Sequence, residues 1–164
     1  MGRGSSALPR DTRLISQRPN SVDGSCNNAP IGLIPSVNNM PSAKFIFPTN
    51  FGTVPKNQSF TVQVAINHIE TGWFTNPMKT FMSSPQVLNA AGDVIGHSHI
   101  AIEHLAGGFN QTTPTDPTNV TYFQGLNAPA VNGVLSWEVP YNAVGPGYYR
   151  IAVIHSAANH QSST

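Results

Sequence analysis

The sequence predicts an all-β fold, an immunoglobulin-like antiparallel β-sandwich, and three observations support this prediction. Apolar and polar residues alternate in short runs along the chain, which places the apolar side chains on one face of each strand. Turn-forming residues separate these runs, with 14 Gly and 14 Pro in 164 residues. No segment repeats apolar residues at helical spacing over three turns. We therefore expect about six or seven short strands rather than helices.

The first two expected strands have the clearest alternation. Phe45 and Phe47 alternate with other residues in residues 43–47 until Pro48 ends the run. Residues 60–66 place four large apolar side chains on one face and small or polar side chains on the other. Both segments are therefore expected to be strands with one buried face.

The middle of the chain predicts a long packed loop followed by a hairpin. Residues 67–84 lack alternation but hold aromatic and Met side chains, which favours a loop that packs against the sheets. Residues 86–88 and 94–103 flank the turn-rich residues 89–93. Gly92 can adopt the left-handed conformation that a tight hairpin turn needs.

Three more strands are expected toward the C-terminus, at residues 120–123, 133–139 and 148–155. The last of them follows a Pro-Gly turn and resembles the penultimate strand of immunoglobulin-like domains, after which one more strand should come. Only the polar residues 156–164 follow. We therefore expect the sandwich to lack its last strand, which leaves an open sheet edge for homo-oligomer formation.

The length and the charge distribution predict one folded domain behind a flexible segment. A chain of 164 residues is typical of a single domain. Residues 1–42 are rich in Gly, Ser, Pro and Asn and lack periodicity, which predicts a flexible leader and an extended arm. Residues 43–164 are expected to form the β-sandwich domain. The two parts of the chain also differ in charge. Residues 1–18 carry a net charge of +3, and the rest of the chain is mildly acidic.

The composition excludes several classes of function. Only 9% of the residues are charged, which is too few for a solvated helical bundle or a coiled coil. Beyond the leader the chain has no cluster of Lys and Arg of the kind that neutralises phosphates, so we expect no nucleic-acid partner. No stretch of 18 apolar residues could span a membrane. The first 17 residues also lack the apolar core of a signal peptide.

Three glycosylation sequons begin at Asn57, Asn110 and Asn119. They make the chain a candidate glycoprotein, and they allow secretion without arguing for it.

The histidines are the strongest candidates for a chemical role. His97 and His99 lie two residues apart on an expected strand, so both rings project from one face, and Glu103 extends that face. His155 and His160 lie at and beyond the end of the last expected strand. If these strands are neighbours, His160 or His155 would add a third ligand for copper or zinc, both of which bind neutral imidazole. The alternative is that these rings hydrogen-bond to polar groups on a polar surface.

A metal-dependent enzyme of cupin-like or dismutase-like type is a second hypothesis. The spacing His97-x-His99-x3-Glu103 matches the first metal motif of the cupins, which are β-barrel proteins. The second cupin motif is not matched, because a full strand separates His155 from the Pro-Gly turn that should lie close to it.

Other chemistries have weaker support in the sequence. Cys26 has no histidine near it in the chain, so a thiol nucleophile is not expected. The large aromatic side chains either pack in the core or form the sugar-stacking platform of a carbohydrate-binding, lectin-like protein. These residues are Trp73, Phe74, Phe81, Trp137, Tyr148 and Tyr149.

Several short motifs occur between residues 24 and 161, and they include Gly24-Ser25-Cys26-Asn27, Met40-Pro41-Ser42-Ala43-Lys44-Phe45, Gly96-His97-Ser98-His99-Ile100, Gln111-Thr112-Thr113-Pro114-Thr115-Asp116-Pro117 and Ala157-Ala158-Asn159-His160-Gln161. In these motifs the chain resembles a family of secreted fungal proteins of unknown function, many of which carry a misleading ribosomal-protein label. The resemblance implies an extracellular β-sandwich without an established activity. It also implies a signal peptide and an additional cysteine upstream, which this chain lacks.

The favoured hypothesis combines the resemblance with the histidine pattern. We expect a non-catalytic extracellular protein that acts at the cell surface, in the cell wall or in host interaction. Its expected partners are a cell-wall glycan or a host protein, and its expected site is the patch of His97, His99 and His160.

Overall fold

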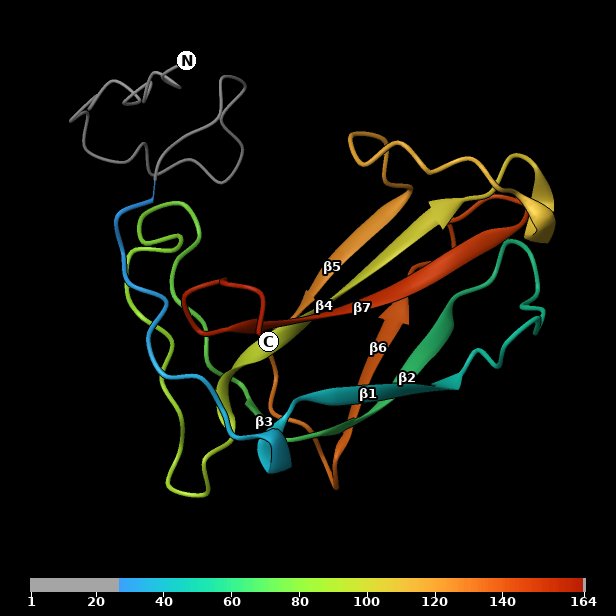
Figure 1. Ribbon diagram of the computed structural model, residues 1–164. Coiled ribbons are helices and arrows are strands. Elements are labelled where there is room, and N and C mark those ends of the chain that lie inside the picture. Colours follow the sequence, from blue (N-terminus) through green and yellow to red (C-terminus); the bar gives the residue numbers. More distant parts are fainter. Residues whose placement is uncertain (1–26, 164) are drawn as a thin grey trace, which may run out of the picture.

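The computed structural model describes residues 27–163, so most of the expected leader and Cys26 lie outside the described residues. Two β-sheets face each other (Figure 1). The first sheet contains, in spatial order, β1 (Ser42–Phe47), β2 (Phe60–Asn67) and β6 (Val134–Val139). The second sheet contains β3 (Ile69–Thr71), β4 (Val94–His104), β5 (Tyr122–Leu126) and β7 (Tyr149–Ala157).

Strand β4 is the centre of the second sheet. It pairs with β7 in antiparallel register from Gly96 to His104. The stretch from Ser98 to Ile102 also pairs with β5, again antiparallel. Strand β3 pairs with the first three residues of β4 in parallel, so this sheet is mixed rather than purely antiparallel.

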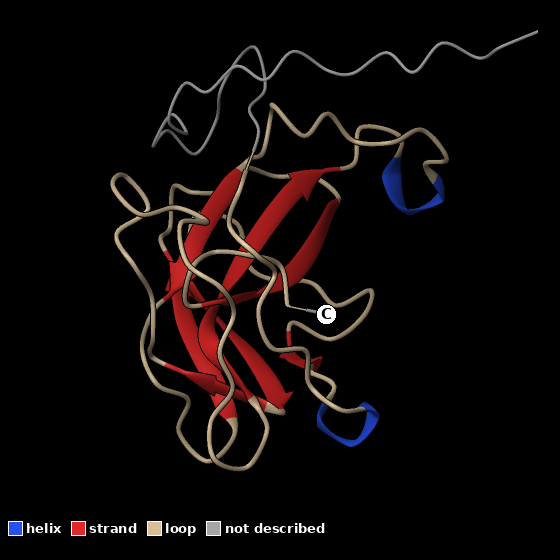
Figure 2. Cartoon of the chain, turned by 60° about the vertical axis from the view of Figure 1, so that its left-hand side comes forward, coloured by secondary structure: helices blue, strands red, loops and turns tan. Residues whose placement is uncertain are grey.

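Helical structure within residues 27–163 is limited to two short 3₁₀ turns, η1 (Val37–Asn39) and η2 (Gly108–Asn110) (Figure 2). The β-sandwich that the sequence predicts is therefore confirmed. In this part of the chain, no helix has both the length and the apolar character needed to cross a membrane.

The core lies between the two sheets and consists of the apolar faces of their strands. Its buried members are Val62, Val64, Ile100, Ile102, Leu126, Leu135 and Val139. Each such side chain stabilises the fold by about 1.5–3 kcal/mol relative to exposure in water. The alternation of apolar and polar residues in the sequence therefore reflects which side chains of each strand are buried between the sheets.

The reverse face of β4 is also buried. His97, Ala101 and Glu103 lie there, and each exposes less than 10% of its surface. Loop residues contact this face, because the ring of Phe74 lies 6.1 Å from that of His97 and the hydroxyl of Thr115 donates to Glu103. A central strand with polar residues on a covered face provides a place for a functional site.

Local structure agrees with the predicted hairpin and differs from the predicted loop. Gly92 has a φ of 88°, and Leu88 pairs antiparallel with Val94 across the turn. Residues 67–84 are mostly loop, but they contain β3, which the sequence analysis missed. Three residues are too few to show alternation, and the parallel pairing with β4 is what makes them a strand.

Strand β5 begins later than predicted, at Tyr122, and runs on to Leu126. Asp116 forms a turn just before it, because its side chain accepts a hydrogen bond from the backbone N–H of Thr118 at 2.8 Å. Gln124 and Gly125 are weak strand formers, so their strand conformation results from pairing with β4 and is not apparent in the sequence.

The outer edge of β7 is partly covered. Ser162 pairs with Ser156, and Ser163 donates its backbone N–H to the carbonyl of His155. Within residues 27–163, the rest of this edge has no strand partner. The expectation of a homo-oligomer through an open edge stays a prediction.

The close approach of β4 and β7 at Gly96 leads to the first prediction. A Cβ atom at this position would lie 2.0 Å from the carbonyl oxygen of Ser156 and 2.9 Å from the Cα of Ala157, and neither backbone atom can move without separating the strands. We expect Gly96→Ala to lower the free energy of unfolding by about 3 kcal/mol or more, as measured by urea denaturation. The matched control is Gly145→Ala, whose new Cβ would meet Tyr149 at an ordinary 3.9 Å and should change stability by less than about 0.5 kcal/mol. Equal stability of the two variants would contradict this account.

Candidate metal centre

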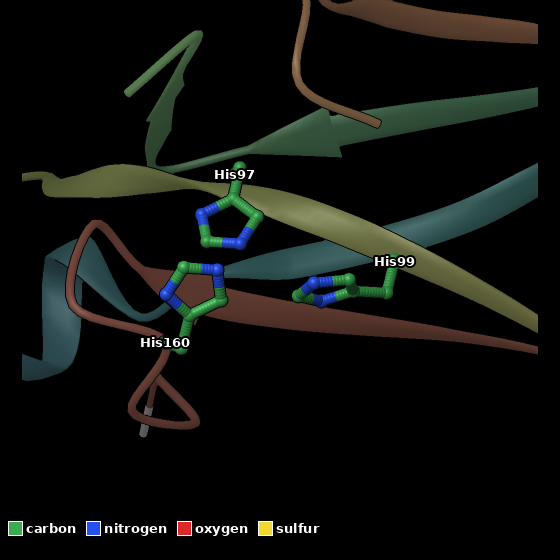
Figure 3. A group of neighbouring side chains, drawn as sticks. All are labelled: His97, His99 and His160. Atoms are coloured by element: carbon green, nitrogen blue, oxygen red, sulfur yellow. The ribbon is translucent and has the colours of Figure 1, made fainter. Parts of the chain in front are cut away.

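Three histidines meet on the covered outer face of the second sheet (Figure 3). His97 and His99 project from the same face of β4, as their spacing predicts. His160 comes from the turn after β7, which the pairing of Ala157 with Gly96 brings back beside the start of β4. One ring nitrogen from each residue can be chosen so that all three lie within 4.8 Å of one another. The ring centroids of His97 and His99 are 4.7 Å apart, and those of His97 and His160 are 4.6 Å apart.

The turn that carries His160 is held rigidly. His160 has a φ of 72°, in the left-handed region that side chains other than glycine rarely adopt. The buried Asn159 fixes the turn, because its Oδ1 accepts the N–H of Gln161 at 2.9 Å and its Nδ2 donates to the carbonyl of Ser84. The backbone carbonyl of Asn159 also accepts the N–H of Met82 at 2.8 Å. These bonds hold the ring of His160 against the other two histidines despite the backbone strain.

The hydrogen bonds around the rings leave ring nitrogens without partners. His97 Nδ1 lies 3.2 Å from the carbonyl oxygen of Trp73, which can only accept, so Nδ1 carries the proton and Nε2 presents its lone pair. Among the described residues, buried ring nitrogens without a hydrogen-bond partner are His97 Nε2 and His160 Nδ1 in this cluster and His155 Nε2 elsewhere. His99 Nδ1 lies 3.3 Å from the hydroxyl of Ser156. A metal-bound histidine commonly donates its second ring N–H to a backbone carbonyl, as His97 does here.

Burial keeps the three rings uncharged at neutral pH. Burial, together with the neighbouring His99 and His160, lowers the pKa of His97 to about 4, because a second positive charge beside these rings is unfavourable. Burial is also the main cause of the lowered pKa of His99 and of His160. Neutral imidazoles are the form that binds zinc and copper.

Aromatic rings surround the histidines. The ring of Phe74 lies 6.1 Å from that of His97, and the ring of Phe81 lies 5.4 Å from that of His160. Phe123 stacks on His99 with a centroid distance of 5.2 Å and an interplanar angle of 23°. This apolar shell limits water around the rings and strengthens electrostatic interactions with any bound cation. This shell could not be predicted from the sequence, because residues 67–84 lack a periodicity that could place Phe74 or Phe81.

Glu103 does not join the histidines, contrary to the sequence hypothesis. Its carboxylate accepts two hydrogen bonds from Arg150, at 2.6 and 2.9 Å, and one from the hydroxyl of Thr115 at 2.5 Å. The hydrogen bond from Thr115, together with those from Arg150, lowers the pKa of Glu103. Glu103 shares a face with His97, but at about 3.3 Å per residue its position lies roughly 20 Å farther along β4. Its partners confirm that it belongs to a separate ion pair.

His155 also lies away from the cluster, so its proposed role as a ligand is corrected. It pairs with Ser98 across the sheet, and its Nδ1 lies 2.7 Å from the Ser98 hydroxyl. Both side chains point toward the core side of the sheet, opposite to His97 and His99. The two-residue period of β7 therefore places His155 on the core side of the sheet, away from His97. His160 lies in the turn beyond β7, so this period does not fix its direction.

The cupin-like hypothesis meets two structural objections. The fold is a sandwich of two sheets rather than a barrel. Glu103, the carboxylate of the matched motif, is bonded to Arg150 instead of lying at the histidines.

The aromatic residues considered for sugar stacking do not form one surface. Trp73, Phe74 and Phe81 lie near the histidine cluster. Trp137 lies on the other sheet, where its indole N–H donates to the hydroxyl of Tyr122 at 2.7 Å. The remaining two, Tyr148 and Tyr149, line a separate cavity beyond the opposite end of β4. The three sequon residues, Asn57, Asn110 and Asn119, are all exposed.

The fold and the site together define a β-sandwich module with a cluster of three histidines, one buried and two half-buried, on the outer face of one sheet. The chain belongs to the family described as the CLU5d N-terminal domain, which matches residues 43–164. It is 37% identical over 139 residues to "Pathogenicity cluster 5 protein d" of Colletotrichum graminicola, and the alignment covers 84% of this chain and 29% of that protein. The chain therefore spans less than a third of the length of that relative. No solved structure matches.

These comparisons confirm the resemblance to a fungal family of unknown function that the sequence motifs indicated.

The lowered pKa values lead to a prediction about stability in the metal-free protein. His97 has a pKa of about 4 in the folded protein, against about 6.5 in the unfolded chain, so below pH 6.5 protons bind preferentially to the unfolded chain. We expect the free energy of unfolding, measured by urea denaturation in the presence of a chelator, to fall as the pH is lowered from about 6.5 to about 4. The carboxylates with lowered pKa values contribute mainly below this window. In His97→Gln the fall should be shallower but still present, because burial also lowers the pKa values of His99, His155 and His160. An equally steep fall in this variant would contradict the assignment.

Proposed function

We propose that this protein acts outside the fungal cell in interaction with a host, and that its β-sandwich binds one copper or zinc ion through His97, His99 and His160. The observation that carries the metal assignment is the convergence of three uncharged imidazoles, two of which have buried ring nitrogens without partners. Leaving a buried polar group unpaired costs about 1–3 kcal/mol. A bound ion would satisfy these nitrogens and remove that cost.

The donor set supports copper or zinc over other divalent ions. Three imidazole nitrogens are borderline ligands, whereas magnesium and calcium favour oxygen ligands. A site with three protein ligands leaves a fourth position for water or for a group from a partner. Neutral ligands also allow the metal to bind at neutral pH without releasing protons from the imidazoles.

The surroundings of the cluster support binding over catalysis. Its ring neighbours are Phe74, Phe81 and Phe123, and phenyl rings offer no general acid or base. Glu103, the carboxylate that could have assisted a metal-bound water, is held by Arg150. We therefore propose a metal that stabilises the module or contacts a partner rather than one that activates water.

Three features support an extracellular, host-directed role. The relative from Colletotrichum graminicola is named for a pathogenicity cluster. The three sequons lie on exposed residues, where export would allow glycosylation. The low content of charged residues is also more typical of extracellular β proteins than of cytosolic enzymes. A host protein or a cell-wall glycan is the proposed partner.

Metal binding can be tested with the purified chain. We expect isothermal titration calorimetry of the chelator-treated protein to show one zinc or copper ion bound per chain, and bound metal to raise the melting temperature. Replacing His97 and His99 together by Gln should weaken binding by at least about 100-fold, because two of three ligands are lost. His104→Gln is the matched control, since His104 contacts Tyr149 and should leave binding unchanged. Unchanged metal affinity in the double variant, or the absence of binding to the wild-type protein, would refute the metal centre.

The host-directed role needs an experiment in the source fungus. We expect the gene product carrying a C-terminal tag to accumulate in the culture medium or the cell wall, and deletion of the gene to reduce host colonisation. Complementation with the wild-type gene should restore colonisation. Retention of the tagged protein inside the cell, or normal colonisation by the deletion strain, would contradict this part of the proposal.

A further inference from the structure

A second candidate site lies beyond the opposite end of β4 from the histidines. Three loops and the ends of the strands there enclose a cavity of about 600 Å³, which is within the range of small-molecule sites. The loops cover residues 48–58, 105–115 and 140–148, and Leu105 directly follows β4 at the cavity wall. Figure 1 shows these loops gathered at one end of the sandwich. The metal proposal assigns no role to this end of the molecule.

Part of the wall of this cavity is a cluster of aromatic rings, and two of these rings are largely exposed. Phe109 contacts both Phe51, at a centroid distance of 5.3 Å, and Tyr148, at 4.9 Å, in edge-to-face geometry. Phe51 exposes 78% of its surface and Tyr148 exposes 55%. These apolar surfaces would leave water on contact with a ligand, which is the usual driving force for binding in such a site.

The cavity is built rigidly and at the expense of local strain. Phe51 has a φ of 59°, a left-handed conformation that is unusual for a bulky side chain. Each of the loops also contains proline, which fixes the backbone and lowers the entropy lost on binding. The prolines that line the cavity are Pro48, Pro55, Pro114, Pro140 and Pro146.

The charges of the wall are positive. Lys56 and Arg150 are the charged residues that line the cavity among the described residues. Arg150 is compensated by its ion pair with Glu103, at 2.6 Å. Lys56 has no ion-pair partner within the part of the chain that the structure describes. An apolar ligand that carries one negative charge would complement this wall.

Two polar side chains of the wall are already bonded within the protein. Gln111 uses both ends of its amide within the protein, because its Oε1 accepts the N–H of Gly107 at 3.0 Å and its Nε2 donates to the carbonyl of Thr113 at 2.8 Å. Thr115 is bonded to Glu103. These two side chains therefore have less capacity to bind sugar hydroxyls, although Asn50, Thr53 and Gln58 also line the cavity.

We propose that this cavity binds a small amphipathic carboxylate, with an apolar body against Phe51, Phe109 and Tyr148 and a carboxylate near Lys56. The site is separate from the histidine cluster and does not depend on metal. A fatty acid and a flat aromatic acid share this chemistry, so the test uses one of each.

The experiment is calorimetric titration of the chelator-treated 164-residue protein with laurate and with 2-naphthoate. We expect at least one of them to bind at one molecule per chain. Binding of laurate would indicate a fatty acid as the ligand, and binding of 2-naphthoate would indicate a flat aromatic acid. Phe109→Ala should weaken binding about tenfold, because it removes the ring that contacts both neighbours. Phe123→Ala is the matched control, since Phe123 is similarly exposed but lies at the histidine cluster. Melting temperatures of the variants establish that each one is folded.

Two further comparisons test whether Lys56 interacts with the carboxylate of the ligand. Lys56→Gln should weaken binding about threefold to tenfold and reduce its salt dependence, whereas Lys79→Gln, at an exposed position outside the cavity, should have no effect. The uncharged amides, lauramide and 2-naphthamide, should bind more weakly than the acids. Equal binding of acid and amide would overturn the carboxylate assignment. Failure of both acids to bind, or binding that Phe109→Ala leaves unchanged, would overturn the site itself.

Discussion

The pairing of β4 with β7 is the constraint on which the rest of the structure depends. Nine consecutive residue pairs, from Gly96 with Ala157 to His104 with Tyr149, hold the two strands in one register. At one end this register returns the chain to the start of β4, so that His160 reaches His97. At the other end it places Arg150 beside Glu103. A shift by one residue would exchange the two faces of β7 and separate both contacts.

The same pairing explains why β4 carries two different kinds of residue. Ile100 and Ile102 fill the core between the sheets, and the alternate residues His97 and Glu103 face a layer of loops. A polar group on such a face must find partners, because water is largely excluded. Glu103 finds them within the protein, from Arg150 and Thr115. The histidines find fewer partners, because His97 Nε2 and His160 Nδ1 have none among the described residues. This difference distinguishes the candidate binding site from the structural ion pair of Glu103.

Much of the fold could be predicted from local patterns, whereas the site depended on contacts that local patterns do not contain. Alternation identified β2, β4 and β6, because each has one face in the core. The shared face of His97 and His99 follows from the period of a strand. Which later histidine joins them depends on the register of β7 and on the turn beyond it, and neither is encoded in spacing. His155 was the nearer candidate in sequence, yet the strand period turns it toward Ser98.

Backbone strain offers an independent view of where function is located. Asn132 also has a positive φ, of 51°, but it precedes Gly133 in a tight hairpin, where Asn is common. Phe51 and His160 are not part of such an Asn-Gly turn, and the left-handed conformation is most unusual for the bulky Phe51. Asn57, His68 and Met82 have positive φ values as well. A fold keeps such conformations only where surrounding contacts impose them, and they concentrate at binding sites. Phe51 borders the aromatic cavity and His160 completes the histidine cluster. Two of the strained positions among the described residues therefore lie at the two proposed sites, where the surrounding contacts that impose the conformation also shape the site.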